Sequence, residues 1–214
     1  MQGADIASQE RAVTMILPLG TLHHAAAFDL VVRVFAGQST LHRALGVEVG
    51  AYRRTLRPGF DAMVGEGLSV VAVEGGAVVG ALIACDFHRA DAPTPEPRTP
   101  IAALTDALYA RYQRHRATEP GQAMLVDMGA VAPGHGGRGL YQRMRDAAED
   151  RGRAAGYRHV IGELSSAATQ YVVLHKRGHA AIAEIAFAEF IHGGTRPFAT
   201  IPAPDRIVLA EGHL

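Results

Sequence analysis

The sequence lacks the features that would direct a protein to a membrane, to nucleic acid or to an oxidising compartment. No apolar run approaches ~20 residues, the length that a membrane-spanning helix needs, and the polar residues 1–11 do not resemble a secretory signal. Lys and Arg together number 21, as do Asp and Glu, so no net charge attracts DNA, RNA or an anionic membrane. The single cysteine, Cys85, cannot form an intramolecular disulfide. We therefore expect a soluble, cytoplasmic protein without a nucleic-acid or membrane partner.

The length and composition fit one folded domain. The 214 residues are 48% hydrophobic, which is enough for a substantial core. Asp91–Pro100 contains four prolines and predicts an extended surface loop. Thr99 as a cap and Pro100 as the first residue then predict a helix that runs to about Arg116. We expect a single domain over residues 1–214, with an inserted proline-rich loop and helix at about 88–118.

Apolar periodicity predicts strands and helices in an order that fits a mixed α/β sheet. Gly75 and Gly76 separate two valine-rich runs and predict a β-hairpin. The helix that ends near Gly156 is predicted to expose its charged face to solvent, namely Arg143, Arg145, Asp146, Glu149 and Asp150. The predicted strands are Ala12–Leu17, Leu68–Val73, Ala77–Phe87, Met124–Val131, Tyr157–Leu164, Ala181–Ile191 and Ile207–Ala210, and further predicted helices are Leu22–Phe35, Gly46–Gly65 and Ala167–Lys176.

The stretch Val126–Arg143 is read as a strand, a glycine-rich turn and the start of a helix. Four of the six residues in Gly134–Gly139 are glycine, which permits positive φ and a close approach of a ligand to the backbone. The first turn of the following helix offers unpaired N–H groups and a partial positive charge. This stretch therefore predicts a site for a di- or triphosphate.

Two common phosphate motifs fit this stretch poorly. The run from Gly134 to Gly139 satisfies G-x-G-x-x-G, and Glu163 follows 24 residues later, as in a dinucleotide-binding fold. However, the match begins at residue 134 of 214, the upstream hairpin is antiparallel, and Pro133 suits a strand that leaves its neighbour. The Walker pattern is absent because no G-K-[ST] follows. A dinucleotide-binding protein remains the lesser alternative.

The segment V-A-P-G-H-G-G-R-G-L-Y, from Val131 to Tyr141, resembles the acyl-CoA-binding segment of the GNAT N-acetyltransferase superfamily. Lys176 and Gly178 match a second pattern of that superfamily. The sequence departs from the first pattern at Gly136, where glutamine or arginine is usual, and at Tyr141, where a small residue is usual. It departs from the second at Leu174, where a tyrosine is usual, and at Ala167, where an asparagine is usual.

The resemblance implies a single-domain α/β fold with a mixed, mostly antiparallel sheet, a splayed central strand and helices on both faces. Phe35–Leu41 and the inserted helix look most like the arylalkylamine and dopamine N-acetyltransferase branch. A glutamate that is catalytic in that branch is Ser39 here, so its role does not carry over.

The resemblance also implies acetyl-CoA as co-substrate, with no metal. Backbone groups of the splayed strand would bind the pantetheine, and N–H groups of the glycine turn would bind the pyrophosphate. Arg138 would add a charge-assisted contact or remain a solvated turn residue, and His135 would contact phosphate or simply be exposed. The predicted cofactor-binding residues are Gly129, Ala130, Val131, His135, Gly136, Gly137, Arg138, Gly139, Leu140 and Tyr141.

Acetyl transfer to an amine needs a base, because an alkylamine with a pKa near ~10 is protonated at neutral pH. Asp127 is the candidate: it is a lone acid in an apolar strand, and alternation places it on the face of Leu125 and Gly129. A structural carboxylate is the alternative. Tyr171, three residues before Leu174, is the candidate proton donor for the CoA thiolate, with His175 and His179 as substitutes and packing as the alternative role.

The sequence therefore predicts an acetyl-CoA-dependent N-acetyltransferase that acts on a primary amine of a small molecule. A non-catalytic acyl-CoA-binding module is the alternative, because the usual tyrosine, glutamate and glutamine or arginine are missing. Without visible clusters of acids, the sequence gives no support for polyamine or aminoglycoside acceptors. A homodimer is left open.

Overall fold

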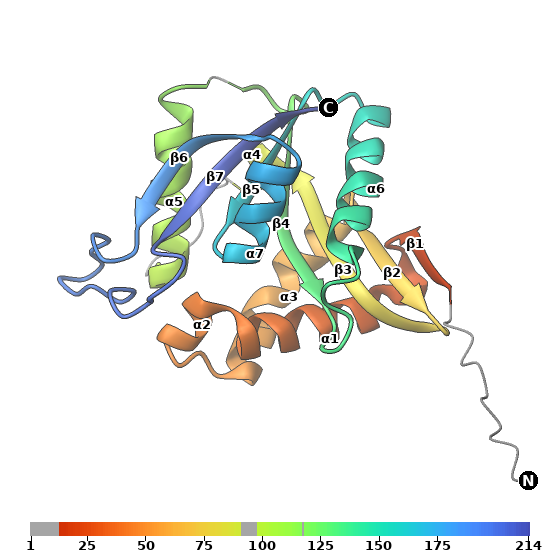
Figure 1. Cartoon of the computed structure of the whole chain (residues 1–214), viewed down its shortest axis with the longest axis horizontal. Helices are drawn as coiled ribbons and strands as arrows, with labels where there is room; N and C mark the ends of the chain where they lie inside the picture. The colour runs from red at the N-terminus through yellow and green to blue at the C-terminus, as the bar shows by residue number, and fades with distance from the viewer. Residues whose placement is uncertain (1–12, 91–97, 117) are drawn as a thin grey trace, which may run out of the picture.

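A computed structural model describes residues 13–90, 98–116 and 118–214 of the chain, so most of the predicted proline-rich loop lies outside the described residues. Its centre is a seven-stranded sheet in the order β1-β2-β3-β4-β5-β7-β6 (Figure 1). β4 and β5 are parallel, whereas every other neighbouring pair is antiparallel. The predicted mixed, mostly antiparallel sheet is therefore confirmed. The strands are β1 (Thr14–Pro18), β2 (Val70–Glu74), β3 (Ala77–Asp86), β4 (Ala123–Val131), β5 (His159–Leu164), β6 (Ala180–Ala186) and β7 (Arg206–His213).

Helices cover both faces of the sheet (Figure 1). One face carries α1 (Thr21–Gln38), α2 (Thr40–Ala44), α3 (Val49–Gly65) and α5 (Pro100–Gln113), and the larger hydrophobic core lies beneath them. The other face carries α6 (Leu140–Ala154), followed after β5 by α7 (Ala167–Gln170) and the π-helical segment η1 (Tyr171–Lys176). A short helix, α4 (Phe87–Ala90), follows β3. The candidate site lies at the sheet, between the two helical layers.

Local sequence signals explain where several elements begin. The Thr99 side chain accepts a hydrogen bond from the backbone N–H of Ala102, and Pro100 is the first helical residue of α5, as predicted. Gly75 and Gly76, with φ of 57° and 80°, form the predicted hairpin turn between β2 and β3. Both signals depend only on residues that are close in sequence, so the features that they predict are present in the folded protein.

Other boundaries differ from the prediction. The strand expected over Ala181–Ile191 ends at Ala186, because the chain turns away after its last partner on β7. The strand expected over Ile207–Ala210 extends from Arg206 to His213, since it is paired on both sides, with β5 and β6. Pairing within the sheet, rather than apolar content, sets these lengths.

β4 and β5 separate half way along β4. They are paired from Ala123 with His159 to Val126 with Gly162, and not beyond. On its other side β4 stays paired with β3 as far as Val131, which lies opposite Gly80. The segment from Asp127 to Val131 thus has one edge without a strand partner within the described sheet, and this is the predicted splay of the central strand.

Candidate active site

A cavity of about 620 Å³ opens at the splay between β4 and β5. It is lined by the end of β4, the glycine-rich turn, the first turn of α6, the start of α7 and η1, and, from the other side of the sheet, Val34 and Gln38 of α1. Eight of the predicted cofactor-binding residues line it, namely Gly129, Val131, His135, Gly136, Gly137, Gly139, Leu140 and Tyr141.

The other two predicted cofactor residues do not line this cavity. Ala130 is fully buried and packs in the core on the α1 side of the sheet. Arg138 turns toward β2, where its guanidinium donates to the Glu74 carboxylate at 2.7 and 3.1 Å. Glu74 also accepts from the Thr14 hydroxyl, and these contacts, led by Arg138, lower its pKa to about 2. Since Arg138 lines no part of the cavity, its proposed contact with phosphate would require it to leave Glu74.

The glycine turn presents backbone rather than side chains to the cavity. Gly134, Gly137 and Gly139 have φ of 82°, 72° and 72°, which a residue with a side chain rarely adopts. Gly139 is the N-cap of α6 and supplies no side chain, so among the described residues no side-chain cap occupies the first-turn amides. A 15-residue helix with its N-terminus on a cavity is a favourable place for an anion.

Tyr141 fills the space left by a glycine. A Cβ atom built on Gly129 would lie 2.6 Å from Cε2 of the Tyr141 ring, so the ring rests directly on the β4 backbone at the splay. The hydroxyl points to Arg145, whose Nη1 lies 3.4 Å away. The large residue that departs from the family pattern is therefore matched by a missing side chain on the strand opposite.

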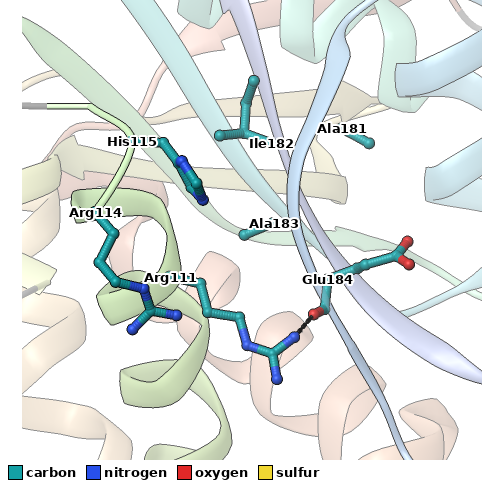
Figure 2. A pocket seen from close by; sticks show the side chains of 7 residues that line it. All are labelled: Arg111, Arg114, His115, Ala181, Ile182, Ala183 and Glu184. Carbon is teal, nitrogen blue, oxygen red and sulfur yellow. Dashed lines mark hydrogen bonds between the residues drawn. The ribbon is translucent and has the colours of Figure 1, made fainter.

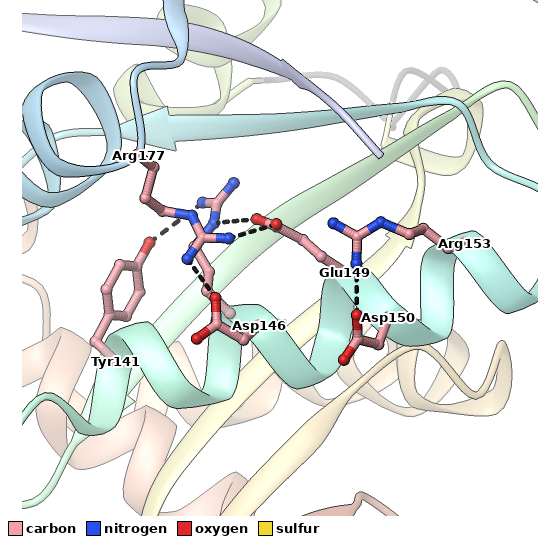
Figure 3. A network of polar contacts seen from close by, with 7 residues as sticks. Tyr141, Asp146, Glu149, Asp150, Arg153 and Arg177 are labelled. Atoms are coloured by element: carbon pink, nitrogen blue, oxygen red, sulfur yellow. Dashed lines mark hydrogen bonds and ion pairs between the residues drawn. The ribbon is translucent and has the colours of Figure 1, made fainter.

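A buried ionic network lies beside Tyr141 and joins α6 to η1 (Figure 3). Arg145 and Glu149 are 0% and 2% exposed, and Arg145 Nε donates to Glu149 Oε1 at 3.1 Å. Arg177, just after η1, donates to Asp146 at 2.6 Å and also to Glu149. The prediction that Arg145 and Glu149 lie on a solvated face is wrong, because η1 and β5 cover that side of α6. Gly162 of β5 makes room: a Cβ there would lie 3.0 Å from Arg145 Nη1.

Asp127 occupies a β-bulge. Met128 is opposite Ile83 and Val126 is opposite Ala84, so Asp127 is the extra residue of β4. The bulge interrupts the alternation: Asp127 stays on the face of Leu125, whereas Gly129 faces α6. The expectation that Asp127 and Gly129 share a face is wrong for this reason. Asp127 and Gly129 thus lie on opposite faces of one short segment.

Glu163 joins Asp127 at the end of the paired part of β5. It accepts hydrogen bonds from the Tyr109 hydroxyl and, at 3.3 Å, from the Thr105 hydroxyl, both on α5. Burial raises the pKa of Asp127 to about 6. Burial and then the charge of Asp127 raise the pKa of Glu163 to about 8, against the two hydrogen bonds, which lower it. The pKa values of both carboxyls are therefore shifted toward neutral pH, where a general base is most efficient.

Sequence reasoning named Asp127 but missed Glu163 as a partner. Glu163 fits the acidic position of the dinucleotide pattern, although it carries the same signal as Asp127, a lone acid in an apolar strand. Its neighbours Tyr109 and Tyr52 come from α5 and α3, and their approach to the acids depends on the tertiary fold.

The candidate proton donors are scattered. Tyr171 is 57% exposed and lines the cavity, with Lys176 Nζ 5.5 Å from the centre of its ring. Leu174 packs with Val173 and Val208 in a small apolar cluster. His179 stands against Gly212, and burial lowers its pKa to about 4. Of the three candidate donors, Tyr171, His175 and His179, only Tyr171 lines the cavity.

A second hollow, of about 330 Å³, lies between the end of α5 and the edge strand β6 (Figure 2). Arg111, Arg114 and His115 line one side, and Arg111 donates to the backbone oxygen of Glu184 on the other. β7 separates this edge from β5 and the splay. Within the described residues there is no cluster of three or more His, Cys, Asp or Glu that could hold a metal, and no helix is long and apolar enough to cross a bilayer.

No protein-family profile and no curated protein matches this sequence. Solved structures do match. The C-terminal condensation domain of Ebony, in complex with β-alanyl-dopamine, has a TM-score of 0.81 at 17% identity, over 95% of this chain and 100% of that one. Arylalkylamine N-acetyltransferase 2 from Aedes aegypti has a TM-score of 0.74 at 12% identity, over 94% and 98%. The fold is that of the GNAT N-acetyltransferases.

Two further matches bear on ligands. The polyamine N-acetyltransferase of Drosophila melanogaster, which catalyses formation of N-acetylagmatine, has a TM-score of 0.76 at 16% identity, over 94% of this chain and 100% of that one. The putative acetyltransferase yncA from Salmonella typhimurium, solved with acetyl-CoA, has a TM-score of 0.54 at 14% identity, over 95% of each chain. The GNAT fold of this chain is therefore shared with proteins that bind acetyl-CoA and with proteins that acetylate small amines.

Proposed function

We propose that this GNAT-fold chain is an acetyl-CoA-dependent N-acetyltransferase whose acceptor is a primary amine of a small molecule. One observation carries the proposal: β4 leaves β5 at Asp127, beside a cavity lined by glycine backbone and the uncapped start of α6. A strand with one free edge offers backbone hydrogen bonds to an extended pantetheine chain, and the start of α6 suits its pyrophosphate. The same bulge places a carboxyl of raised pKa on the other face.

The two faces divide the reaction between them. Pantetheine binds along Gly129–Val131 from the α6 side, with the pyrophosphate at Gly136–Tyr141. The amine enters from the side of α1 and α5, where Asp127 lies. Asp127 removes a proton from the ammonium group, and the neutral amine attacks the thioester, whose carbonyl is polarised by backbone N–H groups of β4. Tyr171, which is exposed in the cavity, is the proposed proton donor to the departing thiolate.

Calorimetric titration with acetyl-CoA tests the binding step, and CoA release across a panel of primary amines tests turnover. We expect saturable binding and release with at least one amine. Asp127→Asn should bind acetyl-CoA as the wild type does but lower kcat/KM by about 10²–10⁴-fold, the usual contribution of a positioned base. Equal activity of the two proteins across pH would show that Asp127 is not the base, and an absence of binding at millimolar acetyl-CoA would refute the function.

A non-catalytic acyl-CoA-binding module is the second candidate, and two observations favour it. Leu174 offers no hydroxyl and is packed in an apolar cluster, and the Tyr141 ring rests on Gly129 within the cavity. This candidate predicts binding without CoA release for every amine of the panel. A dinucleotide-binding protein is disfavoured, since β2, β3 and β4 are antiparallel neighbours rather than the parallel strands of that fold.

A further inference from the structure

Asp127 and Glu163 occupy equivalent places on neighbouring strands. Val126 and Gly162 are the last paired residues of β4 and β5, and the next residue of each strand is the acid. The side chains lie on the sheet face of Leu125 and Ile161, two residues earlier on each strand, under α3 and α5. The parting of the strands thus sets two carboxyls side by side in a half-buried position.

The groups that face this pair do not neutralise it. From α5, Tyr109 and Thr105 donate hydrogen bonds to Glu163, and Asp106 adds a further negative charge. Tyr52 from α3 and Cys85 from β3 lie near Asp127. Burial, and then the negative charge of Asp127, raise the pKa of the Tyr52 hydroxyl and of the Cys85 thiol. Among the described residues, the groups that face the two carboxyls are thus neutral hydroxyls, a thiol and one further acid, Asp106, which pairs with Arg98.

We propose that Asp127 and Glu163 share one proton, and that Glu163 is a positioning residue that holds it so that a single negative charge remains on Asp127. Two adjacent carboxyls with little compensation do not both ionise near neutral pH, because each charge disfavours the other. Tyr109 and Thr105 fix the Glu163 side chain in place. The inference rests on the proposed function, since it names the partner that tunes the base of that reaction.

The Asp127–Glu163 pair begins the reaction with one proton. An N–H bond of the ammonium breaks and an O–H bond forms on Asp127, so that the pair holds two protons and no charge. The nitrogen lone pair attacks the carbonyl carbon, and the C–S bond breaks with its electrons on sulfur. Tyr171 gives its proton to the thiolate, the second proton lost by nitrogen restores Tyr171, and Asp127 returns its proton to solvent.

The pH profile of kcat/KM separates this role from a structural one. In the wild type we expect two inflections, both above the usual pH range of a carboxyl, because burial raises the pKa of both groups: the pair loses one proton at the first and its shared proton at the second. Glu163→Gln imitates the protonated glutamate, so it should keep the first inflection and lose the second. Tyr109→Phe removes a hydrogen bond that lowers the pKa of Glu163, so it should move the second inflection to higher pH. Glu184→Gln, an exposed glutamate on β6, is the matched control and should change neither.

An infrared spectrum at pH 7 gives a readout without turnover. The wild type and Glu184→Gln should show the C=O stretch of a protonated carboxylic acid, and Glu163→Gln should lose it. If the C=O band persists in Glu163→Gln, the proposal of a shared proton is refuted. It is also refuted if the second inflection of the kcat/KM profile, at higher pH, is unchanged in both Glu163→Gln and Tyr109→Phe. If the band behaves as expected but no amine is acetylated, the proposed function fails and the catalytic role fails with it. An active enzyme without the band refutes the pair alone.

Discussion

Gly129 and Tyr141 show how a departure from a family pattern is accommodated residue by residue. The ring of Tyr141 lies where a side chain on Gly129 would be, so the two positions are matched in volume. Close packing makes such a pair sensitive to added atoms. The ring also forms one wall of the cavity, which links this local fit to the cofactor site.

Gly129→Ala should destabilise the protein by about 1–3 kcal/mol, because the new methyl group overlaps the Tyr141 ring. Urea unfolding measures the change. Gly59→Ala is the control, since a Cβ at Gly59 meets no atom within 4 Å. Adding Tyr141→Ala to Gly129→Ala should restore part of the loss; a double variant as unstable as the sum of the two single variants would contradict the fit.

At the scale of elements, the buried ionic network fixes η1 against α6. Arg177 reaches Asp146 and Glu149 (Figure 3), and Glu149 also pairs with the buried Arg145 on the same helix. Because η1 carries Tyr171 and Lys176 into the cavity, the network also determines one wall of the candidate cofactor site. The buried Glu149 and the largely buried Arg177 thus connect two helical segments separated in sequence by β5, with the exposed Asp146 as a further partner of Arg177.

Glu149→Ala should destabilise the fold by about 3–5 kcal/mol, since it leaves Arg145 buried without its carboxylate. Asp150→Ala, one residue further along α6, removes an exposed partner of Arg153 and should change stability by less than about 1 kcal/mol. Chemical unfolding of both variants at one pH makes the comparison. Equal losses would mean that the network contributes no more than a surface pair.

How far the sequence predicts each element follows from how local its causes are. The cap at Thr99, the hairpin at Gly75 and Gly76 and the glycine turn before α6 each depend on a few adjacent residues, and the sequence predicts all three. The bulge at Asp127 depends on the register between β3 and β4. The burial of Arg145 depends on η1 and β5, which come later in the chain. Periodicity within one helix or strand contains no information about such neighbours.

At the scale of the whole molecule, the sheet separates the cavity from the acid pair. The cavity lies on the α6 and η1 side and reaches Val34 and Gln38 of α1 through the splay, while the acid pair lies under α3 and α5. In the proposed reaction, the co-substrate therefore binds on one face of the sheet and the base acts from the other. The hollow beside β6 (Figure 2) has no part in this arrangement.

Hydrogen exchange with and without acetyl-CoA tests this assignment across the chain. Peptides that cover Gly129–Tyr141 should gain protection, because the proposed ligand bonds the free strand edge and the first turn of α6. Peptides from β6 should not change, because β7 separates that strand from β5 and the splay. Protection of β6 without protection of the glycine turn would place the ligand in the hollow beside β6 and contradict the proposed cofactor site.

The place of β7 in the sheet has a consequence for how the protein is made. β6 bonds to the sheet through β7, yet β7 follows it in the chain by about twenty residues. During synthesis β6 therefore leaves the ribosome before the strand that receives it, and β5 waits for the same neighbour. β5 can pair with β4 earlier, but the pairs of β7 with β5 and β6 form only after β7 has left the ribosome, so we expect this part of the sheet to be the late and aggregation-prone part of folding.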